Sequence, residues 1–165
     1  MNPRISLLTF FFFVYSTHVL SNTSWPTPNP DNCDFYTHLE VTMKCSAKGV
    51  SYVSEYAPFY CRRFIEKSKD WSPEAQNWTK KTRLCLQESL YDKRNDPNLS
   101  CANLEEVAFK THSICYNDAD LCQLKVSELF DIFRIVKIKD YFKELKYSDG
   151  GMVRLVKYCL KKQFF

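Results

Sequence analysis

The chain has 165 residues, of which 45% are hydrophobic and 25% are charged, a size and balance typical of one globular domain. Three glycines disfavour a turn-dense β-barrel and cannot form a Walker or dinucleotide phosphate loop. The formal charge of +4, from 23 basic and 19 acidic residues, is too small and too dispersed to indicate nucleic acid as a partner.

Residues 1–21 have the pattern of a secretory signal peptide. Arg4 provides the positive start, an apolar run extends from Ile5 to Val14, and Val19 and Ser21 are small residues before the expected cleavage point. An uncleaved anchor is the alternative, but spanning a bilayer needs roughly 20 apolar residues and this run is much shorter. We therefore expect a secreted, extracellular protein with no membrane span.

All eight cysteines follow this segment: Cys33, Cys45, Cys61, Cys85, Cys101, Cys115, Cys122 and Cys159. An even number of cysteines in a secreted chain predicts a set of disulfides, and spacing alone leaves 105 possible connectivities. A metal site is the competing interpretation. It is disfavoured because no Cys-x-x-Cys pair occurs and because His38 and His112 have no paired spacing. We expect no metal and no cofactor.

Three Asn-x-Ser/Thr triplets predict N-glycosylation and fit the same compartment. They begin at Asn22, Asn77 and Asn98. Asn77 and Asn98 lie near expected helix starts or connections, where a glycan is tolerated, and Asn22 lies at the expected new N-terminus.

The segment 22–32 contains three prolines and no periodic pattern, which predicts an extended, mobile leader before a helical domain over 33–165. Apolar residues at helical spacing predict a first helix between Cys33 and Cys45. A second helix is expected over about 53–68, in which Pro58 marks either a kink or the first turn.

Capping residues mark the next two helix starts. Ser72 followed by Pro73 predicts a third helix that ends near Tyr91. Ser100 predicts the start of a fourth helix, which ends near Asp118. The residues expected to face the core on these helices are Ala75, Trp78, Thr82, Cys85, Leu86, Ser89, Leu104, Val107, Ala108 and Ile114.

The longest apolar periodicity lies between Leu121 and Leu145 and includes Phe130 and Phe133 among its expected core positions. A last short helix is expected from Met152 to Leu160. The predicted fold is therefore all-α, a compact bundle of five or six short helices. Disulfides staple it, because short helices are marginal alone and cross-links restrict the unfolded chain.

The sequence does not favour an enzyme. The order His112-Ser113-Ile114-Cys115-Tyr116 resembles the helix motif of secreted phospholipases A2, but Ser113 stands where their calcium-binding Asp is required and no calcium loop precedes it. We expect His112 to be partly exposed near a helix end, where a cation suits the dipole. No Gly-x-Ser-x-Gly elbow occurs, and a cysteine protease needs a free thiol. The acidic pair at Asp118 and Asp120 is interpreted as a solvated loop.

The cysteine spacing resembles that of the stanniocalcin family. From Cys61 onward the intervals are 24, 16, 14, 7 and 37 residues; the first four match the family spacing and the fifth is close. The matching local text is Cys61-Arg62-Arg63-Phe64, Ser72 to Asn77 before Trp78, Lys80 to Cys85, Cys101, and Ile114-Cys115-Tyr116 leading to Cys122.

Stanniocalcins are secreted helical glycoproteins that act as hormones or local factors in calcium and phosphate balance, and vertebrate members inhibit pappalysin metalloproteinases. The resemblance implies a non-catalytic signalling glycoprotein whose partner is an extracellular receptor or proteinase. It also implies the pairs Cys33–Cys45, Cys85–Cys115 and Cys122–Cys159, which leaves Cys61 for Cys101. The family's intersubunit cysteine has no counterpart after Cys159, so we expect a monomer or a non-covalent dimer.

The alternative hypothesis is a secreted cysteine-rich helical effector that binds a host or extracellular protein or a lipid surface. It shares the fold-level features and has no role in mineral balance. A free thiol would instead indicate a cysteine enzyme, and bound calcium would indicate a phospholipase.

Overall fold

The computed structural model describes residues 25–136, 147 and 150–164. These residues form an all-α fold without a β-strand, which confirms the predicted class. The α-helices of this part of the chain are α1 (Asp34–Met43), α2 (Ala57–Lys67), α3 (Pro73–Tyr91), α4 (Cys101–Asp118), α5 (Val126–Ile135) and α7 (Gly151–Phe164). Short helical turns at Ser46–Lys48, Tyr52–Tyr56, Ser68–Asp70 and Leu121–Gln123 connect them. The expected signal peptide, the sequon at Asn22 and the end of the apolar periodicity over 137–145 lie outside the described residues.

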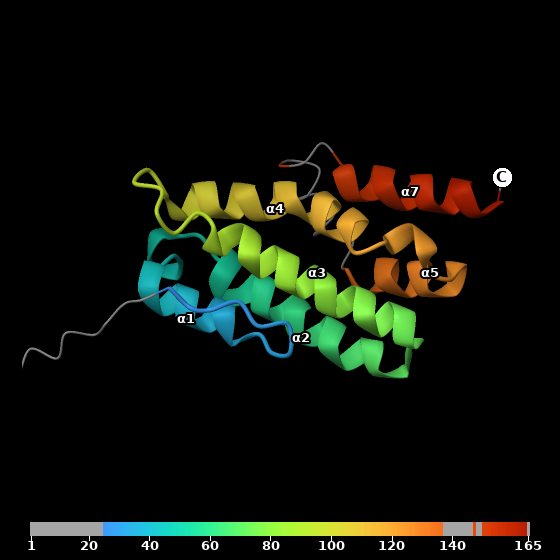
Figure 1. The fold of residues 1–165 in the computed structure, drawn as a ribbon. Helices are drawn as coiled ribbons and strands as arrows, with labels where there is room; N and C mark the ends of the chain where they lie inside the picture. Colours follow the sequence, from blue (N-terminus) through green and yellow to red (C-terminus); the bar gives the residue numbers. More distant parts are fainter. Residues whose placement is uncertain (1–24, 137–146, 148–149, 165) are drawn as a thin grey trace, which may run out of the picture.

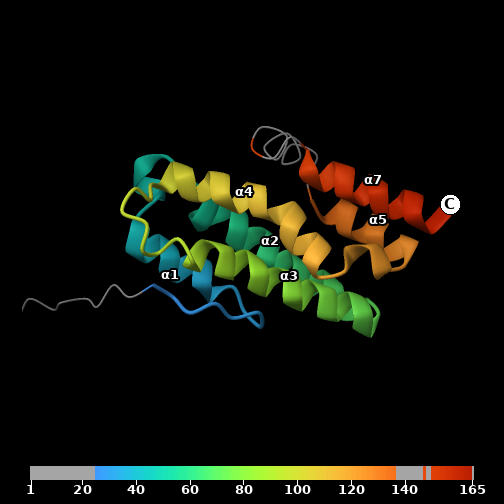
Figure 2. The same ribbon diagram turned by 45° about the horizontal axis from the view of Figure 1, so that its top comes forward.

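The bundle is built on the pair α3 and α4, which lie side by side (Figures 1 and 2). In both views α1 lies at one end of this pair, and α5 and α7 lie at the other. The indole Nε1 of Trp78 donates a hydrogen bond to the carbonyl oxygen of Tyr116 at 3.2 Å, so α3 and α4 are also joined by a polar contact inside the core.

Two clusters of buried side chains form the interior. The first core includes Phe35, Leu39, Val53, Leu104 and Phe109. The second core includes Trp78, Leu121, Leu129, Ile132 and Val156. Both clusters draw on α2, α3 and α4, which therefore run through the whole bundle.

The two capped helix starts are confirmed. The hydroxyl of Ser72 accepts a hydrogen bond from the backbone N–H of Ala75 at 3.2 Å, and α3 begins at Pro73. The hydroxyl of Ser100 accepts one from the N–H of Asn103 at 3.1 Å, and α4 begins at Cys101. Each cap satisfies a backbone donor that the first helical turn leaves without a partner.

The second helix begins later than the predicted residue 53. A single wide turn over Tyr52–Tyr56 leads into α2, and Pro58 occupies the first turn of that helix. Proline is tolerated there because the first-turn N–H groups have no partner within the helix.

Several side chains differ from the sequence pattern in whether they are buried or exposed. Ile114, Phe130 and Phe133 were expected in the core, but their side chains are 55%, 50% and 37% exposed. Conversely, Arg83 and Gln87 are polar and yet buried.

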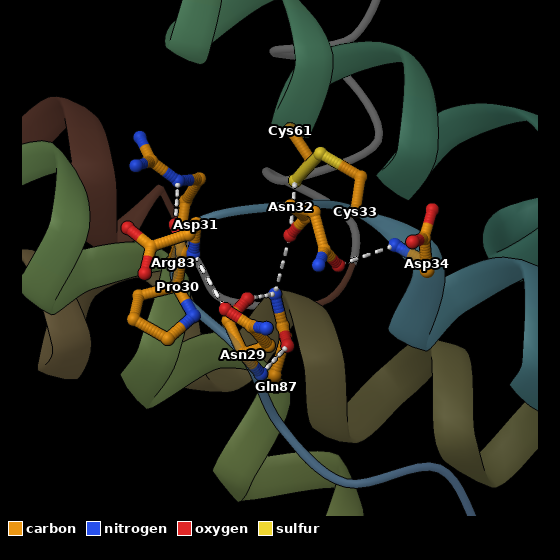
Figure 3. Close-up of a disulfide and its surroundings, with 9 residues drawn as sticks. All are labelled: Asn29, Pro30, Asp31, Asn32, Cys33, Asp34, Cys61, Arg83 and Gln87. Atoms are coloured by element: carbon orange, nitrogen blue, oxygen red, sulfur yellow. Dashed lines mark hydrogen bonds between the residues drawn. A yellow bond between two sulfur atoms is a disulfide. The ribbon is translucent and has the colours of Figure 1, made fainter.

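The described part of the leader is fastened to α3, contrary to the expected mobile segment (Figure 3). The Gln87 side chain accepts a hydrogen bond from the N–H of Asn29 at 2.7 Å and donates to the carbonyl oxygens of Asn29 and Asn32 at 3.0 and 3.4 Å. The Arg83 Nε donates to the carbonyl oxygen of Pro30 at 2.9 Å. The prolines keep the segment extended, and two buried polar side chains of α3 satisfy its backbone groups.

The eight cysteines form four disulfides, and two of these differ from the expected pairs. Cys85–Cys115 joins α3 to α4, and Cys122–Cys159 fixes α7; both were expected. The other two pairs are Cys33–Cys61 and Cys45–Cys101, so the expected pairs Cys33–Cys45 and Cys61–Cys101 are wrong. Four disulfides are typical of proteins from oxidising, extracellular compartments.

The correction has a simple geometric reason. Cys33 and Cys45 flank α1 at its two ends. A helix rises 1.5 Å per residue, which places these two residues roughly 18 Å apart. A disulfide requires Cα atoms within about 7 Å, so the helix itself keeps the two thiols apart.

None of the helices in the described ranges has both the length and the apolar character needed to cross a bilayer.

Candidate functional site

An apolar groove runs between α5 and α7. Its volume is about 200 Å³, and it is lined by Leu129, Phe130, Phe133, Val153, Val156, Lys157 and Leu160. We call it the α5–α7 groove. Only Lys157 among these lining residues is charged, and such a concentration of apolar side chains on a surface is typical of an interaction site.

The groove exists because α5 is apolar on more than one face. Leu129 and Ile132 are buried in the second core, whereas Phe130 and Phe133 lie on the neighbouring face and remain half exposed. On α7, Val156 and Cys159 are buried and Val153 remains partly exposed. The helices α5 and α7 therefore share a set of buried contacts with the second core and, beside it, an apolar face that remains partly exposed.

Contacts to the rest of the bundle hold both walls of the groove. The Cys122–Cys159 disulfide attaches α7 to the turn at Leu121–Gln123. At the start of α5, the Glu128 carboxylate accepts hydrogen bonds from the N–H of Ser72 at 3.0 Å and from the N–H of Lys125 at 3.1 Å. The groove is thus tied to the starts of both α3 and α5.

The pKa of Glu128 lies below its ordinary value. Desolvation of this buried carboxyl raises the pKa, but the hydrogen bonds from Ser72 and Lys125 and the charge of Lys125 together outweigh that effect. Glu128 is therefore ionised at neutral pH, which is the form that accepts both backbone donors.

The helix α7 is basic, and one of its basic residues, Lys157, lines the groove. This helix contains Arg154, Lys157, Lys161 and Lys162 and no acidic residue, and the side chains of all four are exposed. On α5 the charges are mixed, and Arg134 forms an ion pair with Asp131 at 3.7 Å. The positive potential therefore comes from α7.

The asparagines of the two described sequons are exposed. The Asn77 side chain is exposed early in α3, but Thr79 of the same triplet is buried and its hydroxyl donates to the Gln76 carbonyl oxygen at 2.8 Å. The Asn98 side chain is exposed in the loop before α4. Asn98 is the better placed acceptor, because its triplet lies outside a helix except for the cap residue Ser100.

His112 is partly exposed, as expected, but it does not have the environment of a cation. Its ring packs against the rings of Phe109 and Tyr116, and its Nδ1 is buried. Burial lowers the pKa of His112 to about 4, although hydrogen bonding to the backbone of Ala108 and Phe109 acts in the opposite direction. The ring is neutral at pH 7 and does not complement a helix dipole.

The described residues contain no group of three or more His, Cys, Asp and Glu side chains that could hold a metal ion. Asp118 and Asp120 are exposed around the end of α4, and Asp120 has a left-handed backbone with φ of 70°.

The sequence interpretation missed the groove, although a signal for it was present. The order Leu129-Phe130-Asp131-Ile132-Phe133 places four large apolar residues within one and a half turns. An amphipathic helix buries a single stripe, so a cluster this wide must leave part of its apolar surface outside the core.

Comparison of the chain with protein-family models, with curated proteins and with solved structures gave no match.

Proposed function

We propose that this protein is a secreted, non-catalytic binding protein, and that its α5–α7 groove receives an acidic amphipathic helix of an extracellular protein. The observation that carries the proposal is the half-exposed pair Phe130 and Phe133 beside the basic helix α7. The signal-peptide pattern, the disulfides and the sequons support the extracellular setting.

The shape and charge of the groove favour a helix as the occupant. An amphipathic helix places apolar side chains at i, i+3, i+4 and i+7, and these fit a cleft between two helices. Lys157 lines the groove, and Arg154 and Lys161 lie three and four residues from Lys157 along α7, where they complement acidic side chains on the flank of the ligand. A lipid surface is less favoured because the apolar side chains line a concave cleft rather than a protruding face.

The direct test uses synthetic amphipathic peptides. One peptide carries Leu at the anchor positions and Glu elsewhere; its counterpart carries Lys in place of Glu. By fluorescence anisotropy we expect the acidic peptide to bind with a dissociation constant of about 10 µM or lower, and the basic peptide to bind at least tenfold more weakly.

Matched variants locate the binding surface. Phe130→Ser and Lys157→Glu should each weaken binding of the acidic peptide several-fold, while Ile114→Ser, an equally exposed apolar position outside the groove, should have no effect. Equal binding by parent and Phe130→Ser contradicts the assignment. Flotation with vesicles of phosphatidylcholine and phosphatidylserine, without peptide binding, assigns the face to a lipid surface instead.

A hormone-like role in calcium and phosphate balance, with a receptor or proteinase as the partner, is a second proposal and rests on the cysteine intervals. The pairs Cys85–Cys115 and Cys122–Cys159 agree with the pairing that the stanniocalcin resemblance implies. The pairs Cys33–Cys61 and Cys45–Cys101 depart from it. Inhibition of a pappalysin-type proteinase by the purified protein would support this role, and its absence would leave the resemblance without a functional counterpart.

A further inference from the structure

A second feature lies inside the bundle, away from the α5–α7 groove. Side chains from α1, α2, α3, α4 and the turn at Tyr52–Tyr56 line a partly open cavity of about 40 Å³. We call it the tyrosine cavity because most of its wall consists of aromatic rings, among them Tyr36, Tyr52 and Phe64. Its volume corresponds to about three water-sized positions.

Two polar atoms of the cavity-lining side chains are buried and have no hydrogen-bond partner within the described residues. They are Thr82 Oγ1 and Arg83 Nη1. The side chains of Thr82 and Arg83 are only 4% and 9% exposed. Buried polar groups in native proteins are nearly always satisfied, so these two atoms require a partner from outside the chain, either water or a ligand.

Arg83 gives the cavity a positive charge. Its Nε is engaged by the Pro30 carbonyl oxygen at 2.9 Å, which holds the guanidinium in place. Burial lowers the pKa of Arg83, opposed by the charge of Asp31. Asp31 itself forms an ion pair with Lys80 at 2.7 Å, and no carboxylate of the described residues forms an ion pair with Arg83. Among the described residues the guanidinium therefore has no direct ion pair, although the nearby Asp31 charge acts on it.

The other titratable groups around the cavity are neutral at pH 7. Burial raises the pKa values of Tyr36 and Tyr52 above the ordinary value for tyrosine. Burial lowers that of His112 to about 4. One positive charge in an aromatic wall suits a ligand with one negative charge and an apolar body.

We propose that the tyrosine cavity binds a small organic carboxylate, of about the size of acetate to butyrate, with its oxygens toward Arg83 and Thr82 and its hydrocarbon part against the rings. A phosphate fits less well, because a dianion needs more donors than this largely aromatic wall supplies. His112 offers one further hydrogen bond in its neutral form.

The test compares isosteric ligands on the intact, oxidised protein by ¹H–¹⁵N NMR titration. Sodium propionate should shift the resonances of Thr82, Arg83 and His112 along one saturating curve, with a dissociation constant of about 1 mM, as expected for a ligand with few heavy atoms. Propionamide has the same shape without the charge and should cause no saturating shift. Sodium chloride at equal ionic strength controls for screening.

Two variants complete the design. Arg83→Gln should weaken propionate binding at least tenfold, whereas Lys81→Gln, which is exposed on the same helix and does not line the cavity, should leave it unchanged. If Arg83→Gln does not fold, the comparison of propionate with propionamide still decides the question. Equal binding of propionate and inorganic phosphate, equal binding of the amide, or no saturation by propionate would each overturn the proposal, the last result leaving only ordered water in the cavity.

Discussion

At the scale of single residues, two buried polar side chains of α3 determine the path of the N-terminal segment. Gln87 is fully buried, and its amide exchanges hydrogen bonds with the backbone of Asn29 and Asn32. A glutamine amide has both a donor and an acceptor, so it replaces the partner that an extended segment would find in a neighbouring strand.

Replacing Gln87 therefore removes hydrogen bonds that hold the N-terminal segment. We expect Gln87→Leu to lower the free energy of unfolding by about 1 kcal/mol, because the N–H and C=O of Asn29 lose the partly buried hydrogen bonds that they form with the Gln87 amide. Denaturant unfolding measures the loss, and Glu88→Leu, next in sequence but exposed, is the matched control. Equal stability of the two variants would show that the segment does not depend on Gln87.

His112 predicts a pH dependence of stability. Its pKa is about 4 in the folded protein and 6.5 for the free side chain, so the unfolded chain binds more protons between these values. The contribution of the neutral His112 ring to the free energy of unfolding is complete above pH 6.5 and is lost as the pH falls toward 4. The other titratable groups of its cavity, Arg83 and the tyrosines, do not change charge in this window.

Between pH 7 and pH 5 we expect the parent to lose about 2 kcal/mol more unfolding free energy than His112→Gln, which cannot titrate. Denaturant unfolding at the two pH values gives both numbers. Parallel pH profiles for the two proteins would mean that the ring is accessible to water.

At the scale of elements, the sequence was most informative where structure is set locally. The starts of α3 and α4 follow from Ser72, Pro73 and Ser100, whose side chains act within one turn. The wide turn at Tyr52–Tyr56 has no such local signal. The burial of Gln87 could not be predicted either, because it depends on a segment 58 residues away in sequence.

Ser100 has two roles that can be separated. It caps α4 and it is also the third residue of the sequon at Asn98. Ser100→Ala should cost about 1 kcal/mol beyond any effect of Asn98→Gln, which removes only the glycan acceptor. Ser100→Thr should restore both roles. Thermal unfolding measures the effect on the cap, and the mass of the secreted product measures glycosylation. Identical melting temperatures for Ser100→Ala and Asn98→Gln would show that the Ser100 cap does not stabilise α4.

The expected Cys33–Cys45 disulfide was incompatible with the helix that was predicted between the same two residues. A helix between Cys33 and Cys45 was predicted, and so was a bond between the same two residues; a straight helix of that length permits only one of them. The helix forms and the bond does not. Which distant cysteine pairs with each of them depends on how α1, α2 and α4 pack, and no local pattern specifies that.

At the scale of the whole molecule, the disulfides are unevenly distributed between the two ends. The disulfides Cys33–Cys61 and Cys45–Cys101 lie in the first core, away from α5 and α7. The Cys122–Cys159 disulfide attaches α7, one wall of the groove, to the rest of the bundle. Periodicity alone did not reveal the groove, because Phe130 and Phe133 follow the same spacing as buried residues; the signal was the width of the apolar cluster at residues 129–133.

Removing one bridge should therefore loosen one end only. In Cys122→Ser/Cys159→Ser we expect faster amide exchange in α5 and α7, with little change in α1 and the first half of α4, and weaker binding of the acidic peptide. Hydrogen exchange read by mass spectrometry resolves these segments. Uniformly faster exchange across the chain would instead show that the bundle opens as one cooperative unit.

The position of α1 between two cysteines has a consequence for the order of oxidation. A chain that emerges from its N-terminus into an oxidising compartment presents Cys33 and Cys45 before either native partner, Cys61 or Cys101, is available. These two thiols are the first that can react with each other, because a ten-residue helix is marginal before the rest of the bundle is present. A Cys33–Cys45 bond and α1 exclude each other, so any such early bond has to be exchanged before α1 can form.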